Sequence, residues 1–399
     1  MERALFQMAA QIPLAWKNLT HSWRRLMVAV SGISFAVVLM FMQTGFRNAL
    51  FDSTVKMVRD IDADVIMFSK ARFSLSAQHR FPIDRIHQAA SCPAAESVDP
   101  LYLENTISLL RSDGHQGRPI RVIGFDLNCN RFTTAGVDPG IDLVRGPNTA
   151  LIDSRSKPNY HFPLQDITNG NPATGELAGQ QIHFVGTFSM GTDFANEGNV
   201  VMSAENFAAY FPARRLGADP LSVVDLGIAK AHSGVSADRL RDEIKSALGP
   251  TTDVYVVTRD EFVNDEIRFW GKSTPIGIIF GIGTAMGFIV GVIICYQIIF
   301  TDIADHMSEF ATLKAMGYSD GYFTRFVITE AFYLSIFGFI PGLLVAFVLF
   351  ALVTSQTGLL MVMTLPRALL VFGLTLTMCV MSGIAAMRKL QSADPASLF

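Results

Sequence analysis

The sequence is poor in cysteine and in charge. Its 399 residues include only four cysteines, and Asp, Glu, Lys and Arg together make up 17% of them. A soluble domain carries about 25% charged residues, and small disulfide scaffolds are dense in cysteine. Half of the residues are hydrophobic. This composition excludes a disulfide scaffold, a disordered chain, a collagen and a coiled coil, and it suits several membrane spans joined to one large water-soluble domain.

Motifs for metal binding and catalysis are also lacking. The eight histidines form no H-E-x-x-H and no H-x-H motif, and no Cys-x-x-Cys occurs. Gly271-Lys272-Ser273 resembles the end of a phosphate-binding loop, but Glu266 stands where the loop requires its first glycine. We therefore expect no catalytic residue, no metal or cofactor site and no ATP site in this chain, which is then not an enzyme by itself.

The charges that are present gather in the middle of the chain. Residues 51–270 hold 21 Lys and Arg against 28 Asp and Glu, a net charge of −7, whereas the rest of the chain holds 11 against 7. The acidic block has no basic patch of the kind that binds nucleic acid. The two ends are charge-poor, as a hydrocarbon environment demands.

Four apolar segments are long enough to cross a bilayer, which takes about 20 residues. We place transmembrane helices at 26–50, 273–301, 323–354 and 366–388, with a short turn at the polar residues Ser355–Gly358 between the last two. The expected fold is a multi-pass α-helical membrane protein with a large α+β periplasmic domain inserted between the first and second helices. A signal peptide is the alternative for the first segment, although signal cores span only about 7–15 residues.

Basic residues flank the first and last spans, which favours cytoplasmic termini. Arg24 and Arg25 precede the first span, and Arg388 follows the fourth. We therefore expect the remaining segments on the cytoplasmic side: an interfacial helix at 1–25, a loop at 302–322 and a tail at 389–399. A poorly ordered N-terminal tail is the alternative to the interfacial helix.

The central block alternates between strand and helix patterns, which predicts an α+β domain. In a strand at Asp62–Ser69, Val65 and Met67 would face one side and Ile66 and Phe68 the other. Further elements are expected in this order: a helix at Pro82–Ala90, a hairpin of strands Glu104–Leu110 and Pro119–Phe125 around Asp113-Gly114, strands at Gln181–Phe188, Asn199–Ser203 and Ser222–Lys230, a helix at Val235–Leu248 and a strand at Asp253–Thr258.

These elements suggest a division of the central block. We expect residues 51–127 and 221–270 to form one subdomain and residues 128–220 to form an insertion into it. Cys92 and Cys129 both lie in the block. The sequence is compatible with a disulfide between them and also with two free thiols. Cys295 and Cys379 fall in spans and are expected to be small packing residues.

The second span carries glycines at four-residue spacing, which lets two helix backbones approach closely in lipid. We expect these residues to pack against another helix: Gly277, Gly281, Gly283, Gly287 and Gly291. The spacing does not decide whether that helix belongs to the same chain or to a second copy. Tolerance of glycine in membrane spans is the alternative explanation.

The loop after the second span contains a short amphipathic helix. Phe310, Leu313 and Met316 give it one apolar face, and Gly317 suits its C-cap. Such a helix fits a groove on a cytoplasmic partner, and a tightly packed turn is the alternative.

Glu330 interrupts the third span. An ionisable residue inside a span is a functional candidate by default. It lies about two turns from the start of its helix, within reach of Lys314 or Arg325. We expect a structural ion pair that anchors the loop helix, with a proton or substrate role as the alternative.

Several of these segments resemble a known family. The stretch EFATLKAMGY (309–318), the span with Glu330, and Phe337-Gly338 followed by Pro341-Gly342 resemble the MacB/FtsX superfamily of ABC-transporter permeases. The N-terminal residues 12–53 and the C-terminal ADPASLF (393–399) look like DevC-type permeases of glycolipid exporters. The resemblance covers the whole chain, with one departure at His306, where the superfamily commonly has arginine.

The resemblance implies an inner-membrane permease of two copies that works with separate ATPase subunits, which bind the ATP, and with a periplasmic membrane fusion protein. Its coupling helix, 309–317, would dock on the ATPase through Glu309, Phe310, Leu313, Lys314, Met316 and Gly317. Motion of the periplasmic domains would then drive export of a lipid-like or amphipathic substrate. The alternatives are an FtsX-like regulator of a periplasmic partner and lipoprotein extraction of the LolC/LolE kind.

Overall fold

The computed structural model of the chain describes residues 23–129, 131–193, 195–214, 219–307, 312, 316–357, 359 and 361–391. Most of the expected interfacial helix at 1–25 lies outside these residues, as does most of the tail at 389–399. The chain divides into a helical unit (within Met1–Asn48, Gly277–Val353 and Met361–Phe399) and a sheet unit (Ala49–Ile276 with Thr354–Leu360).

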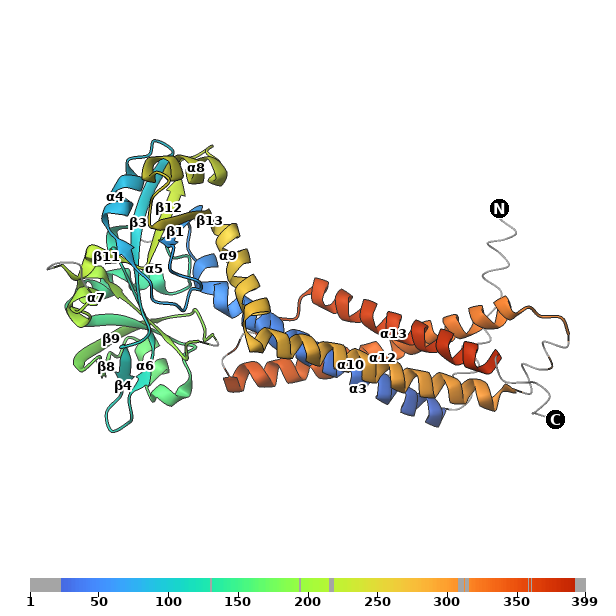
Figure 1. Cartoon of the computed structure of the whole chain (residues 1–399). Helices are drawn as coiled ribbons and strands as arrows, with labels where there is room; N and C mark the ends of the chain where they lie inside the picture. The colour runs from blue at the N-terminus through green and yellow to red at the C-terminus, as the bar shows by residue number, and fades with distance from the viewer. Residues whose placement is uncertain are drawn as a thin grey trace. The chain divides into compact units, whose positions relative to one another are not determined.

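The helical unit is built from four long helices (Figure 1). They are α3 (Trp23–Arg59), α10 (Pro275–Asp305), α12 (Asp320–Thr357) and α13 (Leu365–Gln391). Within the described residues, these four helices are the ones long and apolar enough to cross a membrane. The predicted class is confirmed: four such helices, with a large α+β unit between the first and the second.

The predicted turn between the third and fourth spans is wrong at its start. Helix α12 continues through Ser355 and Gln356, and α13 begins at Leu365. Serine and glutamine each cost only about 0.5 kcal/mol or less in a helix, so two polar residues do not end it. Pro366 lies in the first turn of α13, where its missing N–H leaves no helical hydrogen bond unmade.

The described residues of the sheet unit form one 11-stranded sheet and a two-stranded ribbon, β2 with β11. The order in the large sheet is β13-β1-β12-β3-β6-β10-β7-β9-β8-β4-β5, antiparallel except for the β6–β10 and β7–β9 pairs. The strands are β1 (Val65–Ser69), β2 (Phe81–Pro82), β3 (Ala95–Glu104), β4 (Leu109–Arg111), β5 (Arg118–Pro119), β6 (Arg121–Phe125), β7 (Thr149–Asp153), β8 (Ala173–Leu177), β9 (Gln180–Phe188), β10 (Asn199–Ser203), β11 (Val223–Val224), β12 (Leu226–Ala231) and β13 (Val254–Thr258).

Helices cover both faces of this sheet. They are α4 (Asp84–Ala90), α5 (Val137–Gly140), α6 (Leu164–Thr168), α7 (Ala204–Tyr210), α8 (Ala237–Leu248) and α9 (Arg259–Arg268). The predicted alternation in β1 is confirmed: Val65 and Met67 lie in the core beneath α4, α7 and α8, whereas Ile66 lies in the opposite core with residues of α9. Each core therefore takes alternate residues of the same strand.

Several predicted elements differ from the structure. The strands predicted at Pro119–Phe125 and Ser222–Lys230 are each divided in two, into β5 and β6 and into β11 and β12. Pro82 belongs to β2, and α4 begins only at Asp84. The predicted strand Glu104–Leu110 is interrupted, because the Glu104 carboxylate accepts hydrogen bonds from the backbone N–H groups of Thr106 (3.0 Å) and Ile107 (3.3 Å). The backbone therefore turns after Glu104, and a new strand starts at Leu109.

The sheet also runs across the predicted division of the domain. The hairpin β4–β5 around Asp113-Gly114 forms as expected, with Gly114 at φ 76°. However, β4 pairs with β8, which lies in the predicted insertion 128–220. The hairpin thus belongs to the same end of the sheet as the insertion, although it was assigned to the flanking subdomain.

Candidate functional site

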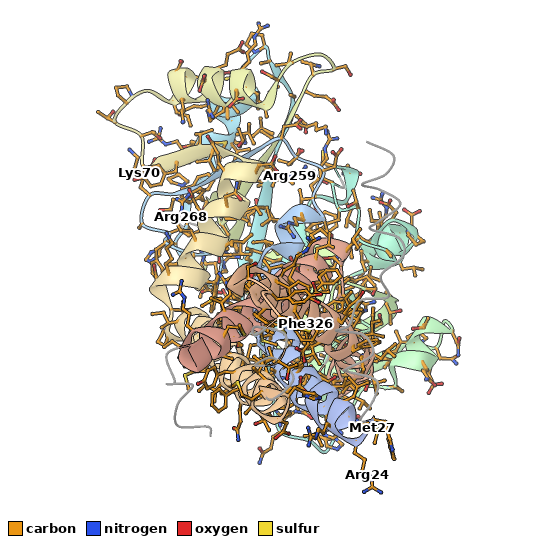
Figure 2. All side chains as sticks on the ribbon, turned by 90° about the vertical axis from the view of Figure 1, so that its right-hand side faces the viewer. Arg24, Met27, Lys70, Arg259, Arg268 and Phe326 are labelled. Atoms are coloured by element: carbon orange, nitrogen blue, oxygen red, sulfur yellow. The ribbon has the colours of Figure 1, made fainter. Side chains whose placement is uncertain are left out.

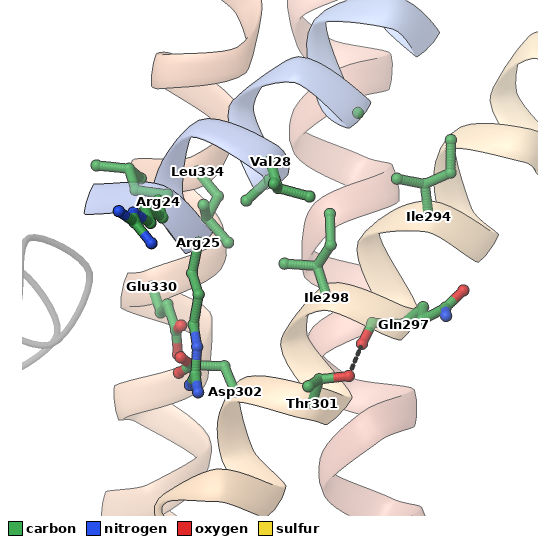
Figure 3. Close-up of a pocket in the computed structure, with 13 residues that line it drawn as sticks. Arg24, Arg25, Val28, Ile294, Gln297, Ile298, Thr301, Asp302, Glu330 and Leu334 are labelled. Atoms are coloured by element: carbon green, nitrogen blue, oxygen red, sulfur yellow. Dashed lines mark hydrogen bonds between the residues drawn. The ribbon is translucent and has the colours of Figure 1, made fainter. Parts of the chain in front are cut away.

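A pocket of about 540 Å³ lies between α3, α10 and α12 in the helical unit (Figure 3). Much of its wall is apolar, with Val28 from α3, Ile298 from α10 and Leu334 from α12 among the lining residues. Arg24 lies at the same pocket but is exposed, and it points away from the helices together with Met27 in Figure 2, whereas Phe326 lies among them.

Two acidic side chains meet in this pocket. Glu330 is only 1% exposed, and its carboxyl group forms a side-chain hydrogen bond with that of Asp302. The Oε2 atom of Glu330 has no hydrogen-bond partner among the described residues. Nearby, Arg25 Nη1 lies 2.6 Å from Asp305 Oδ2, and Thr301 Oγ1 donates to the Gln297 carbonyl at 2.8 Å. The pocket therefore holds a buried carboxyl group whose polar contacts are incomplete.

The environment of Glu330 differs from the expected ion pair. Arg325 is exposed, and within the described part of the chain it forms no ion pair with Glu330. Lys314, the other candidate, lies outside the described residues. The neighbour found instead is Asp302 of α10, a helix that ends 25 residues before Glu330 in sequence. Residue spacing within the helix of Glu330 could not have predicted this contact, because the two residues belong to different helices.

Three of the five predicted packing glycines contact a helix of the same chain. A Cβ added to Gly283 would meet the Gln43 side chain of α3 at 2.5 Å, and one on Gly287 would meet Met40 at 3.5 Å. At Gly291 the added atom would meet Ala36 at 3.0 Å and also Met378 of α13. These glycines therefore let α10 lie close to α3, which identifies one of the two partners that the spacing left open.

The other two glycines behave differently. Gly281 has no heavy atom within 4 Å of an added Cβ. Gly277 is buried. The helical period explains why some of these glycines contact another helix and Gly281 does not. Residues 283, 287 and 291 share one face of α10, whereas 281 lies on another face.

A second set of close-packed glycines lies on α12, where the sequence pattern was not interpreted as packing. A Cβ on Gly338 would lie 2.6 Å from Ile33 Cβ, and one on Gly342 would lie 2.7 Å from Val37 Cγ1. Ser34 Oγ also donates to the Gly338 carbonyl at 2.9 Å. The signal that could have found this contact is the four-residue spacing Gly338-x-x-x-Gly342 itself.

The predicted coupling helix falls mostly outside the described residues, since Glu309, Phe310, Leu313 and Lys314 are not described. At its end, the Met316 backbone N–H donates to the Thr312 carbonyl at 3.1 Å. Gly317 has φ 95°, the left-handed conformation that favours glycine after a helix. Met316 is 63% exposed, and its contact with a partner stays a prediction.

The cysteines are all free thiols. Cys92 is buried and Cys129 is half-buried, and they form no disulfide. Cys295 and Cys379 are buried within the helical unit with their sulfur atoms 3.6 Å apart, so they pack α10 against α13. The described residues contain no group of three or more His, Cys, Asp or Glu side chains placed to hold a metal ion.

The sheet unit has a separate aromatic pocket of about 330 Å³, lined by Phe68, Phe73, Tyr255 and Phe262 among others. Phe73 and Tyr255 are 64% and 50% exposed. At the pocket, the buried Glu266 carboxylate accepts hydrogen bonds from Leu75 N (2.9 Å) and Trp270 Nε1 (2.8 Å), and burial raises its pKa above the ordinary value. Exposed rings around a cavity of this size suit a partly apolar ligand.

A buried ionic network stabilises the middle of the sheet unit. Asp225, fully buried between β11 and β12, accepts hydrogen bonds from Leu103 N at 2.9 Å, from Arg72 Nη2 at 3.2 Å and from Arg214. Burial lowers the pKa of both guanidinium groups, and the charge of Asp225 opposes that shift. The three side chains therefore compensate one another's buried charge.

Comparisons with known proteins agree with part of this description. Residues 278–395 match the family model described as FtsX-like permease C-terminal. Similar solved structures include the periplasmic region of MacB from Actinobacillus actinomycetemcomitans (15% identity, 52% of this chain and 94% of that chain, TM-score 0.34). Another is the extracellular domain of YknZ, a noncanonic ABC-type transporter from Gram-positive bacteria (12%, 49% and 99%, TM-score 0.32). No curated protein matches the sequence. The narrower DevC-type resemblance stays a prediction.

Proposed function

We propose that this chain is the membrane subunit of an ABC exporter and that a separate ATPase supplies the energy. The match of residues 278–395 to the FtsX-like permease model carries the proposal. The four long apolar helices agree with it, as does the large α+β unit inserted between the first and the second.

The exported substrate is proposed to be lipid-like or amphipathic. Buried ionisable groups are rare among the described residues of the four helices, Glu330 being one. A span lined in this way offers little to a hydrophilic solute. The aromatic pocket of the sheet unit, with exposed rings beside a buried carboxylate, suits a molecule that is partly apolar.

The partners follow from the same proposal. A second copy of the chain, two ATPase subunits and a periplasmic membrane fusion protein would complete the exporter. In this arrangement, the loop at 302–322 faces the ATPase, both termini are cytoplasmic, and residues 51–270 lie outside the inner membrane. The chain itself binds no ATP in this proposal.

Co-purification tests the ATPase contact. Phe310→Asp or Leu313→Asp places a charge on the apolar face of the loop helix, so the ATPase should no longer co-purify with the permease. Leu143→Asp is the matched control, because Leu143 is 51% exposed in the sheet unit, and it should retain the ATPase. Stoichiometric ATPase in both loop variants would refute the proposed docking site.

A further inference from the structure

The buried carboxyl group of Glu330 has one oxygen, Oε2, with no hydrogen-bond partner among the described residues. Its carboxyl group also forms a side-chain hydrogen bond with that of Asp302, so two acidic groups lie together at the pocket. A buried polar atom is costly unless it is hydrogen-bonded. The acidic pair is therefore incomplete without a further donor.

Two basic groups near the acids have other contacts among the described residues. Arg25 is paired with Asp305 at 2.6 Å. His306 Nδ1 lies 2.9 Å from the Asp302 backbone carbonyl, which can only accept, so its proton is used there, and it is 3.9 Å from Asp302 Oδ1. A hydrogen-bond donor that carries a positive charge, entering from the pocket, would satisfy Glu330 Oε2.

The pocket around the acids has room for a ligand much larger than a single water molecule. Its volume is about 540 Å³, whereas a water molecule occupies about 30 Å³. Val28, Ile298 and Leu334 supply apolar walls, and Arg24 brings an exposed positive charge to the same pocket. A ligand that fits has an ammonium group, an anionic group beside it, and a hydrocarbon part.

We propose that this pocket binds a membrane phospholipid whose headgroup carries a primary ammonium, as phosphatidylethanolamine does. The ammonium N–H groups donate to Glu330 and Asp302, the phosphate faces Arg24, and the first part of an acyl chain lies against Val28 and Leu334. The lipid is a resident ligand of the helical unit. The proposal does not depend on the exporter function, because neither an ATPase nor a transport assay is needed to test it.

Lipid competition tests this site in the full-length protein. The protein is reconstituted in nanodiscs that contain equal amounts of phosphatidylethanolamine and phosphatidylcholine with matched acyl chains, and the lipids that stay bound after release into detergent are counted by native mass spectrometry. The two headgroups have the same charge, but the choline ammonium has no N–H to donate. Wild type should retain phosphatidylethanolamine about tenfold over phosphatidylcholine, the effect expected of one hydrogen bond to a charged group.

Two substitutions test whether the acidic side chains of the pocket cause the preference for phosphatidylethanolamine. Glu330→Gln should bring the ratio close to one, and Asp302→Asn should lower it. Glu205→Gln, the same change at an exposed carboxylate of the sheet unit that lines neither pocket, should leave it unchanged. Equal retention of the two lipids by wild type, or a preference that survives Glu330→Gln, would overturn the proposal. If Glu330→Gln does not fold, the wild-type ratio and Asp302→Asn decide the matter.

Discussion

At the scale of single residues, the sheet unit depends on charges that are buried and paired. Asp225 is 0% exposed and is surrounded by the guanidinium groups of three arginines and by a backbone N–H. Removing one member of such a group leaves the others buried without compensation, which is costlier than replacing the whole group by apolar side chains. The positions most sensitive to substitution are therefore polar.

Asp225→Ala should lower the free energy of unfolding of the sheet unit by about 3–5 kcal/mol, because Arg72 would lose its paired acid and Arg214 would keep only its longer contact with Glu104. Urea denaturation of the full-length protein in detergent, followed by the fluorescence of Trp270, measures the change. Asp142→Ala is the control, since that side chain is 86% exposed, and its effect should stay within about 0.5 kcal/mol. Equal effects of the two substitutions would contradict the network's role.

The start of α9 gives a pH-dependent prediction. Thr258 N donates to Glu261 Oε2 at 2.8 Å, and Glu261 N donates to Thr258 Oγ1 at 3.2 Å, which forms a capping box. The hydrogen bond from the Thr258 backbone holds the pKa of Glu261 below its ordinary value of 4.5. A depressed pKa stabilises the folded state above the ordinary value, and that stabilisation disappears as the pH falls through the folded-state pKa.

Thermal unfolding of wild type and Glu261→Gln checks this. Wild type should be the more stable at pH 7, and the difference should shrink as the pH falls below the ordinary value of 4.5 and through the lower folded-state pKa of Glu261. Thr258→Ala should lower stability by about 1 kcal/mol, because it removes the other half of the cap. A gap between wild type and Glu261→Gln that grows in acid would show that the carboxylate does not act as a cap.

At the scale of elements, glycine sets how closely the long helices approach. Helix α3 meets α12 at Gly338 and Gly342, and it meets α10 at Gly287 and Gly291. Lipid tails are as apolar as the side chains, so helices in a membrane associate through close van der Waals contact and hydrogen bonds rather than hydrophobic burial. The Ser34 hydroxyl, which donates to the Gly338 carbonyl, adds one such bond.

Gly338→Ala should destabilise the helical unit, since its Cβ would lie 2.6 Å from the branched Cβ of Ile33, which cannot rotate away. We expect about 1–3 kcal/mol, the range for overpacking. The melting temperature in detergent, measured by size-exclusion chromatography after heating, shows the loss. Gly373→Ala in α13 has nothing within 4 Å of the added atom. It should melt no lower than wild type, since alanine favours the helix over glycine. A similar loss in both variants would show that the contact with Ile33 is not the cause.

The sequence pattern predicted helices and strands well where each depends on residues close together in the chain. The alternation in β1, the hairpin at Asp113-Gly114 and the four long helices all follow from residues close in sequence. Contacts between distant segments could not be predicted in the same way. The spacing of Glu330 within its helix pointed to Arg325, but its neighbour Asp302 comes from another helix, and the break after Glu104 depends on how one carboxylate bonds to the backbone.

At the scale of the whole molecule, the prediction concerns which side of the membrane each end of α10 faces. The basic residues near both termini favour a cytoplasmic end at Asp305 and an outer end at Pro275. Large domains cross membranes largely regardless of their charge, so the acidity of residues 51–270 does not decide the matter. Orientation matters because an ATPase can reach only the cytoplasmic loops.

Cysteine labelling answers this in intact spheroplasts. In a background without Cys92 and Cys129, Ser233→Cys should react with a membrane-impermeant maleimide, and Ser319→Cys should react only after the membrane is permeabilised. Both positions are exposed in the structure, so access to the side chain does not limit either reaction. The reverse pattern would invert the topology and place the loop at 302–322 beyond the reach of a cytoplasmic ATPase.

The glycine spacing on α10 has a consequence for sliding motion. Gly283, Gly287 and Gly291 recur every four residues, close to one helical turn. If α10 moved lengthwise by four residues, about 6 Å at 1.5 Å per residue, Gly287 would take the place of Gly283, and Gly291 that of Gly287. Cys295 would take the place of Gly291, where even a Cβ atom would meet Ala36 at 3.0 Å. The glycine contact with α3 would therefore be recreated at two of its three positions, and the cysteine at the third opposes the slide. Rotation of α10 about its own axis would recreate none of them, because the opposite side carries isoleucines such as Ile282 and Ile289.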